Sequence, residues 1–175
     1  STNRAEGGNG EKLSEMFDGN QNTKGLLANG CAAGDTYIQY TYNEPKIITQ
    51  YTLRSANDCG RRHPADWTLV GSNDGFETST LLDTVTDNEF TAAYQLKTFD
   101  VDAPGSYTSY RIYVTRCQTT LFSDGYTFNE DLQLSELAFF EANQASVDCE
   151  DSNGYGSAVN GSISTKACDN NSYGV

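Results

Sequence analysis

The chain has 175 residues, of which 24 are acidic and 11 are basic, so its formal net charge is −13. This length corresponds to one domain with a short additional segment and is enough to bury a hydrophobic core. The acidic charge excludes general binding to nucleic acid or to an anionic membrane, and the single histidine, His63, excludes a histidine-rich zinc site.

The chain begins with a polar segment and continues as a series of short strands. One helical turn is predicted at 11–17, where Leu13, Met16 and Phe17 share a face. Period-two patterns predict strands at 37–42, 47–55, 67–71, 81–85, 94–101, 107–115 and 132–140. Asp74-Gly75 supplies the positive-φ position of a turn at 72–75. Short strands separated by turns, without long helices between them, favour an all-β antiparallel sandwich or jelly roll over a parallel α/β sheet.

The last part of the chain differs in composition. Residues 145–175 lose nearly all bulky apolar side chains and become rich in Gly, Ser and Asn. We therefore divide the chain into a sandwich domain at 1–144 and an irregular tail, or the start of another module, at 145–175. Cys149 and Cys168 bracket most of this tail. A disulfide between them would close a loop of about 20 residues and contribute roughly 3 kcal/mol; the alternative is a flexible linker in which each cysteine pairs elsewhere.

Cysteine usage indicates the compartment. The five cysteines, at 31, 59, 117, 149 and 168, form no CxxC pair, which excludes a zinc ribbon and a thioredoxin motif. Scattered cysteines in a Tyr-, Asn- and Gly-rich acidic chain are typical of secreted or cell-surface proteins with disulfides. N-glycosylation sequons at Asn160 and Asn170 agree with a glycoprotein. No apolar stretch approaches the ~20 residues of a membrane span. Without a starting Met or a signal peptide, we expect a piece processed from a longer, multidomain parent chain.

Three segments resemble the motifs of a known family. They are 16–23 (MFDGNQNT), the block 51–75 with RHPADWTL at 62–69 and GSNDG at 71–75, and LSEL at 134–137. In this order they resemble the discoidin, or coagulation factor V/VIII C-terminal type, domain, and they are most similar to family 32 carbohydrate-binding modules. The resemblance covers about residues 1–142. It implies a galactose-binding-domain-like sandwich of the jelly-roll type.

The first motif resembles a structural calcium site. A hard cation takes six to eight oxygen ligands, and Gly19 permits the tight turn that would wrap one. By resemblance, Asp18 and Glu136 supply carboxylates and Thr23 supplies its hydroxyl and carbonyl. Further carbonyls are expected from Glu15, Asn20 and Ser135. Such an ion would tie the N-terminal loop to the last strand and stabilise the fold. The alternative is an Asx turn at Asp18 and a surface Glu136.

The strand residues around Trp67, in the second segment, are interpreted as core. One Trp in an alternating strand usually packs inside, so Trp67, Leu69, Tyr51 and Leu53 are assigned to the core. Asp66 is expected to cap or fix the loop before this strand.

The loop at 57–64, within the second segment, carries the candidate glycan contacts. In the modules that the chain resembles, loop Arg, His and Asn side chains hold a sugar at one end of the sandwich, against an aromatic face. The matching candidates are Asn57, Arg61, Arg62, His63 and Arg116, with an aromatic wall from Phe122, Tyr126 or Phe128. Alternatively, Arg62 pairs with Asp58 or Asp66 and His63 is merely exposed. The chain departs from the family pattern at Lys24, where a sugar-stacking Trp or His often follows the calcium motif.

The same end of the sandwich is expected to hold three cysteines. Of the pairings among Cys31, Cys59 and Cys117, Cys59–Cys117 is favoured first and Cys31–Cys117 second. One cysteine then remains free, or has its partner in another chain.

These observations predict a calcium-stabilised, extracellular, lectin-like carbohydrate-binding module for a galactose- or fucose-type glycan. The alternative is a structural or cell-adhesion subunit that self-associates through the 122–128 loop or a Tyr-rich face. Catalysis is not expected, because no nucleophile elbow, phosphate loop or metal-hydrolase motif is present.

Overall fold

The computed structural model describes residues 1–8, 10–32, 34–119 and 130–142. The chain divides into the units Ser1–Ala142 and Asn143–Val175. The predicted tail, with Cys149 and Cys168, therefore lies outside the described residues, as do Phe122, Tyr126 and Phe128.

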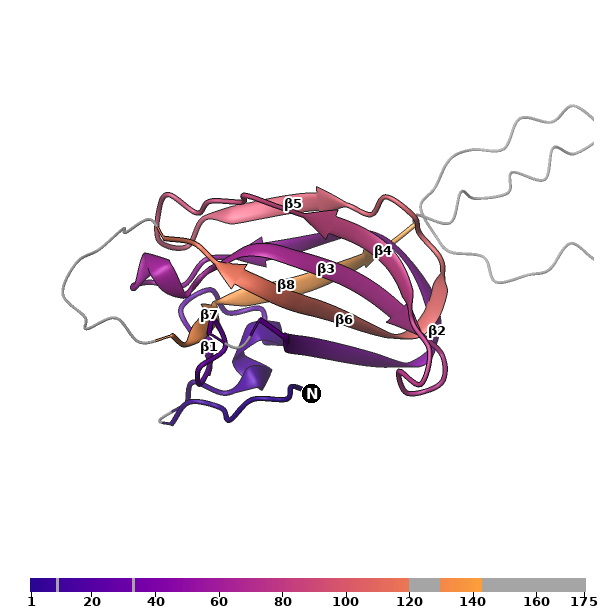
Figure 1. Cartoon of the computed structure of the whole chain (residues 1–175), viewed down its shortest axis with the longest axis horizontal. Coiled ribbons are helices and arrows are strands. Elements are labelled where there is room, and N and C mark those ends of the chain that lie inside the picture. Colours follow the sequence, from indigo (N-terminus) through magenta and orange to yellow (C-terminus); the bar gives the residue numbers. More distant parts are fainter. Residues whose placement is uncertain (9, 33, 120–129, 143–175) are drawn as a thin grey trace, which may run out of the picture. The chain divides into compact units, whose positions relative to one another are not determined.

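Eight strands and two short 3₁₀ helices make up the described part of the chain (Figure 1). They are η1 (Leu13–Phe17), β1 (Gly25–Leu27), β2 (Thr36–Arg54), η2 (Gly60–Arg62), β3 (Pro64–Ser72), β4 (Thr80–Val85), β5 (Leu96–Asp100), β6 (Ser106–Cys117), β7 (Leu132–Leu134) and β8 (Glu136–Glu141). Every pairing between them is antiparallel. None of the helices among the described residues is long and apolar enough to cross a membrane.

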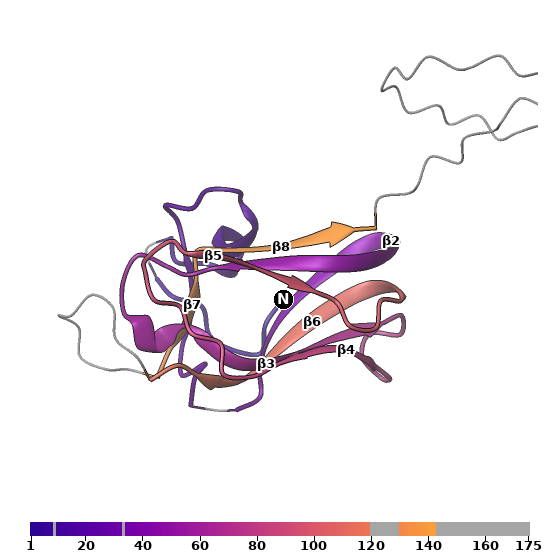
Figure 2. The same cartoon turned by 90° about the horizontal axis from the view of Figure 1, so that it is seen from above.

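The long strand β2 links the two layers of the sandwich. Its first half pairs with β6, which continues to β3 and β4, and its second half pairs with β5 on one side and β8 on the other. Figure 2 shows β3, β4 and β6 in one layer, β5 and β8 in the other, and β2 running through both. The sequence predicted two strands here, because Asn43-Glu44-Pro45 interrupts the alternation. The register shifts between Thr41 and Lys46, and a bulge tolerates a proline that has no N–H.

The core lies between these layers and contains the four predicted residues. Trp67, Tyr51, Leu53 and Leu69 are all buried, which confirms their assignment. The Trp67 ring meets Phe99 edge-on at 5.0 Å, and the Tyr51 ring stacks on Phe99 at 5.3 Å. Trp67 Nε1 donates to the Tyr51 hydroxyl at 2.9 Å, and that hydroxyl donates to Asp83 Oδ2 at 2.6 Å. The buried polar groups of this core thus satisfy one another.

The β3–β4 hairpin forms at the predicted turn. Gly75 has a φ of +73°, as the Asp-Gly pair indicated. Asp74 accepts hydrogen bonds from the Thr78 hydroxyl at 2.6 Å and from the Thr78 backbone N–H. These bonds lower the pKa of Asp74 to about 2. The turn is therefore held by a carboxylate as well as by glycine.

A small second sheet, β1 with β7, was missed from the sequence. It pairs Gly25 with Leu134 and Leu27 with Leu132. A Cβ at Gly25 would lie 2.6 Å from Cγ of Met16, so the close packing of β1 on η1 requires glycine. The predicted strand at 132–140 is interrupted at Ser135, whose hydroxyl donates to the Ser55 carbonyl at 2.9 Å.

Candidate functional site

A pocket lies at the end of the sandwich where β6 ends and η2 begins. Its volume is about 340 Å³, and we call it the rim pocket. Its lining residues are Cys31, Ala32, Arg61, Thr115, Arg116, Cys117, Gln118, Thr119 and Glu130. Both Thr119 and Glu130, which flank the 120–129 segment, belong to this lining.

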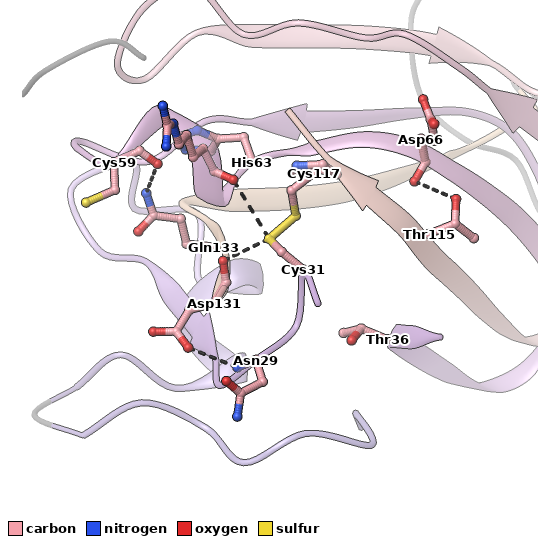
Figure 3. Close-up of a disulfide and its surroundings, with 12 residues drawn as sticks. Asn29, Cys31, Thr36, Cys59, His63, Asp66, Thr115, Cys117, Asp131 and Gln133 are labelled. Atoms are coloured by element: carbon pink, nitrogen blue, oxygen red, sulfur yellow. Dashed lines mark hydrogen bonds between the residues drawn. A yellow bond between two sulfur atoms is a disulfide. The ribbon is translucent and has the colours of Figure 1, made fainter. Parts of the chain in front are cut away.

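A disulfide between Cys31 and Cys117 forms one wall of the rim pocket (Figure 3). It joins the segment after β1 to the last residue of β6, with a Cα–Cα distance of 5.3 Å. The second of the two predicted pairings is therefore present, and the favoured pairing, Cys59–Cys117, is wrong.

Backbone geometry explains why Cys59 does not pair with Cys31 or Cys117. It precedes η2 with a φ of +43°, and its carbonyl accepts a hydrogen bond from Gln133 Nε2 at 3.3 Å. In Figure 3 its sulfur points away from the disulfide. Burial raises the pKa of its thiol. Cys31 is held in place instead, because its N–H donates to the Glu130 carbonyl at 2.7 Å.

Arg116 is the best-positioned candidate contact in the rim pocket. Its Nε and Nη2 donate to the two oxygens of Asp66 at 2.6 and 2.7 Å, and Nη2 also donates to Asp87 at 2.7 Å. These acceptors raise the pKa of Arg116, and the guanidinium lowers the pKa of Asp66. The side chain remains 43% exposed. The two Nη1 hydrogens have no acceptor among the described residues. Asp66, expected to fix the preceding loop, fixes Arg116 and accepts from the Asp87 backbone N–H.

Arg116 also borders a second, smaller hollow of about 150 Å³. This hollow shares Arg116, Gln118 and Thr119 with the rim pocket and extends to Asp87 and Glu89. Gln118 is buried, and its amide donates to the Phe90 carbonyl at 3.0 Å while accepting from the Phe90 N–H at 2.8 Å. The segment after β6 is thus fixed to the backbone at Phe90, and Arg116 lies between the rim pocket and the smaller hollow.

His63 was predicted as a glycan contact, and this prediction is wrong. Its side chain is fully buried, with the ring 5.6 Å from the ring of Phe90. Nε2 accepts from the Ala56 N–H at 2.8 Å, and Nδ1 lies 2.9 Å from the Gly60 carbonyl, so Nδ1 carries the proton. Burial lowers the pKa of His63 to about 4. The neutral ring therefore fixes the loop at 56–63 from inside and cannot reach a ligand.

The other loop candidates divide between the pocket and the scaffold. Arg61 lines the rim pocket. Arg62 is largely buried, with Nη2 4.0 Å from Asp131 Oδ2, so it is a structural partner of Asp131 and not of Asp58 or Asp66. Asn57 is exposed but does not line the pocket.

Lys24 stands where the family often has a sugar-stacking ring. Its Nζ lies 2.8 Å from Asp58 Oδ1 and 3.5 Å from Glu11 Oε1, and its side chain is mostly buried. A scaffold ion pair therefore takes the place of that ring. None of the described rim-pocket residues is aromatic.

Several polar pocket residues were not predicted. Thr115 lies near the end of β6, and Gln118 and Thr119 directly follow this strand, where a polar run was the only signal. Glu130 carried no signal, because its place depends on the pairing of β7 with β1.

The predicted calcium ligands come together at a different place, between η1 and β8. Asp18 Oδ1 accepts from the Asn20 N–H at 2.7 Å and Oδ2 accepts from the Thr23 hydroxyl at 2.8 Å, while Gly19 adopts a φ of +75°. Burial, reinforced by the neighbouring Asp18 carboxylate, raises the pKa of Glu136 to about 7. Oε1 of Glu136 is buried without a hydrogen-bond partner in the described part of the chain.

This arrangement fits a cation held by a carboxylate pair and loop oxygens. Among the described residues, no group of three or more His, Cys, Asp or Glu side chains is placed to hold a metal. Glu15, whose pKa is raised by partial desolvation and by Asp18, lies at the same loop. Ser135 is buried and leads into Glu136. The fully buried oxygen of Glu136 next to a second carboxylate is the feature that a hard cation would satisfy.

Comparison with known proteins gives one sequence match and many structural ones. No protein-family model matches the chain. A peptide-N(4)-(N-acetyl-beta-glucosaminyl)asparagine amidase of Arabidopsis thaliana is 38% identical over 89 residues, which are 51% of this chain and 12% of that protein. The match thus spans about an eighth of the curated relative.

Solved structures share the fold at low sequence identity. The family 32 carbohydrate-binding module of NanJ from C. perfringens, in complex with galactose, has a TM-score of 0.60 and 16% identity, and the match covers 79% of this chain and 90% of that one. The module CpGH89CBM32-5 from Clostridium perfringens, in complex with GalNAc-beta-1,3-galactose, has a TM-score of 0.61 and 13% identity, with coverage of 80% and 92%. A chitosan-binding module from Paenibacillus sp. IK-5 has a TM-score of 0.56 and 17% identity, with coverage of 79% and 95%. The predicted fold, an all-β antiparallel sandwich, is confirmed, and it is similar to the fold of these solved modules.

Proposed function

We propose that this chain is a carbohydrate-binding module that holds a glycan with a terminal galactose- or fucose-type sugar in the rim pocket. The observation that carries the proposal is Arg116. Its orientation is fixed by Asp66 and Asp87, and it keeps two N–H donors for the hydroxyls of a sugar. Arg61 adds a second guanidinium to the same lining. The sugars named for the solved modules of the same fold support this ligand class.

Binding without cleavage fits the described lining of the pocket. A glycosidase needs a pair of carboxylates, and Glu130 is the one carboxylate in that lining. His63 is buried and neutral, so it is not available as a base near the pocket. The amidase relative acts, by its name, at N-acetylglucosaminyl asparagine. We therefore include N-linked glycans among the ligands to be tested.

We further propose a structural calcium ion between Asp18 and Glu136. Asp18, Glu136 and the Thr23 hydroxyl would be side-chain ligands, and the carbonyls of Glu15, Asn20, Thr23 and Ser135 would complete the set. The ion would supply positive charge that relieves the repulsion between the two carboxylates and would tie η1 to β8. A secreted or cell-surface location accords with the disulfide.

A glycan array in calcium, repeated with chelator, tests the proposal. Arg116→Ala removes a charged donor, and such hydrogen bonds contribute about 1.5–3 kcal/mol, so the affinity for the best glycan is expected to fall at least about tenfold. Lys46→Ala is the matched control, because Lys46 also forms an ion pair, with Glu141 at 3.2 Å, but does not line the rim pocket. A blank array with folded protein, or equal binding by Arg116→Ala, contradicts the proposal.

The alternative, a structural or adhesive subunit, is favoured by a different observation. Cys59 is partly exposed and unpaired among the cysteines that the structure describes, and Leu81 on β4 and Leu96 on β5 are 56% and 48% exposed. Sedimentation velocity over a range of concentrations, with and without reductant, tests this role. Concentration-dependent assembly with a blank glycan array would favour it over sugar binding.

A further inference from the structure

The outer face of the β2–β6 pair carries a connected cluster of polar and aromatic side chains, which we call the Arg111 face. Its six members are, in facing pairs, Tyr37 and Tyr113, Gln39 and Arg111, and Thr41 and Ser109. The alternate residues Ile38 and Ile112 are buried in the core, so these six lie on the side that faces away from β5 and β8 (Figure 2). The Arg111 face shares no residue with the lining of the rim pocket.

Aromatic rings fix the guanidinium group of Arg111. Its Cζ lies 4.0 Å from the centre of the Tyr37 ring and 3.7 Å from the centre of the Phe76 ring, which belongs to the hairpin between β3 and β4. Two rings this close to one carbon atom fit only on different sides of the guanidinium plane. The rings therefore cover both faces of the cation and leave its edge for hydrogen bonds.

The edge of this guanidinium has donors that the protein does not use. Arg111 Nε donates to Gln39 Oε1 at 2.8 Å, and Nη1 donates to the Tyr113 hydroxyl at 2.8 Å. The three other N–H donors of Arg111 have no acceptor among the described residues. Because the Tyr113 oxygen accepts from Arg111, its own proton points elsewhere and adds another donor. A cluster of donors is matched by a group that only accepts, such as a carboxylate.

The nearest polar groups along β2 are also held in place. Gln39 Nε2 donates to the Thr41 hydroxyl at 3.0 Å, and the hydroxyls of Thr41 and Ser109 are 3.0 Å apart. The Thr41 side chain is exposed, and Gln39 is partly exposed. A row of oriented amide and hydroxyl groups thus leads away from Arg111, and such groups suit a ligand with several hydroxyls.

The charges around Arg111 leave room for an anion. None of the ion pairs among the described residues includes Arg111, although the chain has 24 acidic residues. The Ser1 amino group donates to the Gln39 carbonyl at 2.8 Å. Burial lowers its pKa, Glu6 opposes this shift, and the Arg111 charge adds to it. At physiological salt the repulsion from distant acidic residues is screened over about 8 Å, so Arg111 dominates the local attraction.

We propose that the Arg111 face binds an acidic sugar, a uronate, whose carboxylate accepts hydrogen bonds from the Arg111 guanidinium and the Tyr113 hydroxyl. A planar carboxylate can accept from two N–H groups of one guanidinium, which a single sugar hydroxyl does not match. The sugar hydroxyls would reach toward Gln39 and Thr41, and this favours a pyranose over the apolar stem of an Asp or Glu side chain. The inference goes beyond the rim-pocket function and does not depend on it.

Titration of the ¹⁵N-labelled full chain with a matched pair of sugars tests the proposal. The probes are the methyl α-glycosides of galacturonic acid and of galactose, which differ only in the carboxylate. Each is added up to about 20 mM, because a single sugar in an open site binds in the millimolar range. We expect the uronate, and not the neutral sugar, to shift the backbone amide signals of Tyr37, Arg111 and Tyr113.

Variants of the two donor side chains sharpen this test. Arg111→Gln removes the charge and the paired N–H groups, so it should weaken uronate binding at least tenfold. Tyr113→Phe keeps the ring and removes the hydroxyl, so it should weaken binding severalfold, and it is the second variant if Arg111→Gln does not fold. Arg54→Gln is the matched control, because Arg54 also lies on β2 but donates to the Tyr94 carbonyl at 2.8 Å. Its uronate response should equal that of the wild type.

Several results would overturn the inference. They are equal shifts with both sugars, no shift with the uronate, and unchanged binding by Arg111→Gln or, if that variant does not fold, by Tyr113→Phe. Shifts of the same signals by acetate or by a glutamate-rich peptide at an equal or lower concentration would reject a sugar as the occupant. Absence of shifts at Gln118 and Thr119 with both sugars counts against the rim-pocket function alone, and absence at Tyr113 counts against the Arg111 face alone.

Discussion

Removal of the Cys31–Cys117 disulfide is expected to destabilise the sandwich strongly and to weaken glycan binding. The bridge spans 86 residues, and the chain-entropy relation gives about 4–5 kcal/mol for a loop of that length. A domain of this size has a total stability of about 5–15 kcal/mol, so the loss is a large fraction of it. Both cysteines also line the rim pocket, so the loss of the bridge frees the segment that carries Arg116.

The assay is urea unfolding of the Cys31→Ala/Cys117→Ala double variant, followed by Trp67 fluorescence. The midpoint should fall substantially, and the dependence of the unfolding free energy on urea should rise, because the unfolded chain exposes more surface without the bridge. Cys59→Ala is the matched control, because Cys59 forms no disulfide within residues 1–142 as described, and it should unfold like the wild type. Affinity for the best array glycan is measured on the same three proteins.

Two results would refute this reasoning. If the double variant loses less than about 1 kcal/mol, the loop-closure argument fails for this chain. If Cys59→Ala is destabilised instead, the pairing at the rim involves Cys59 and the structure of the η2 loop is different from the one described.

Three further predictions concern single side chains. Burial lowers the folded-state pKa of His63 to about 4 from 6.5, so the unfolded chain binds the proton first as the pH falls. Up to about 3 kcal/mol should be lost between pH 6.5 and 4, and a urea series over pH should be flatter for His63→Gln. Tyr51→Phe leaves Trp67 Nε1 and Asp83 without their shared partner, and calorimetry should show a loss of about 2–4 kcal/mol. Wild-type protein should gain thermal stability on addition of calcium, by about 2.7 kcal/mol at a hundredfold excess over Kd. Glu136→Gln should show little of this gain.

The fold was predictable because its signals are local and repeated. Alternation around Trp67 and in β6 identified core strands, and the Asp74-Gly75 turn placed the hairpin between β3 and β4. The motifs at 16–23 and 134–137 carried the family resemblance, which implied the type of sandwich. The sequence analysis divided β2 into two strands, at 37–42 and 47–55, although the strand is continuous. β2 runs through the polar Asn43–Pro45 stretch because each of its halves has partners in a different layer, and pairing between distant strands leaves no local pattern.

The candidate site was predictable only in part, because the backbone conformation of a loop decides where each of its side chains points. Arg61 and His63 are two residues apart and looked equivalent in sequence. The turn of η2 directs Arg61 to the rim pocket and places His63 against Phe90, which is 27 positions further along the chain. Cys59, the cysteine nearest to the Arg pair, similarly has a positive φ and forms no disulfide with another described cysteine. Such positive φ values are uncommon outside glycine, and composition gives no sign of them.

One short helix, η1, connects the proposed calcium site with the Tyr40 ring on β2. Met16 of η1 packs in the core, Phe17 contacts Tyr40, and Asp18 begins the loop that faces Glu136. A cation between Asp18 and Glu136 would therefore also fix Phe17, and with it one side of the Tyr40 ring. Calcium removal is thus expected to shift the backbone amide signals of Phe17 and Tyr40 while leaving those of Gln118 and Thr119 unchanged. Equal changes in both regions would mean that chelation loosens the whole sandwich, and this local coupling through η1 would then be wrong.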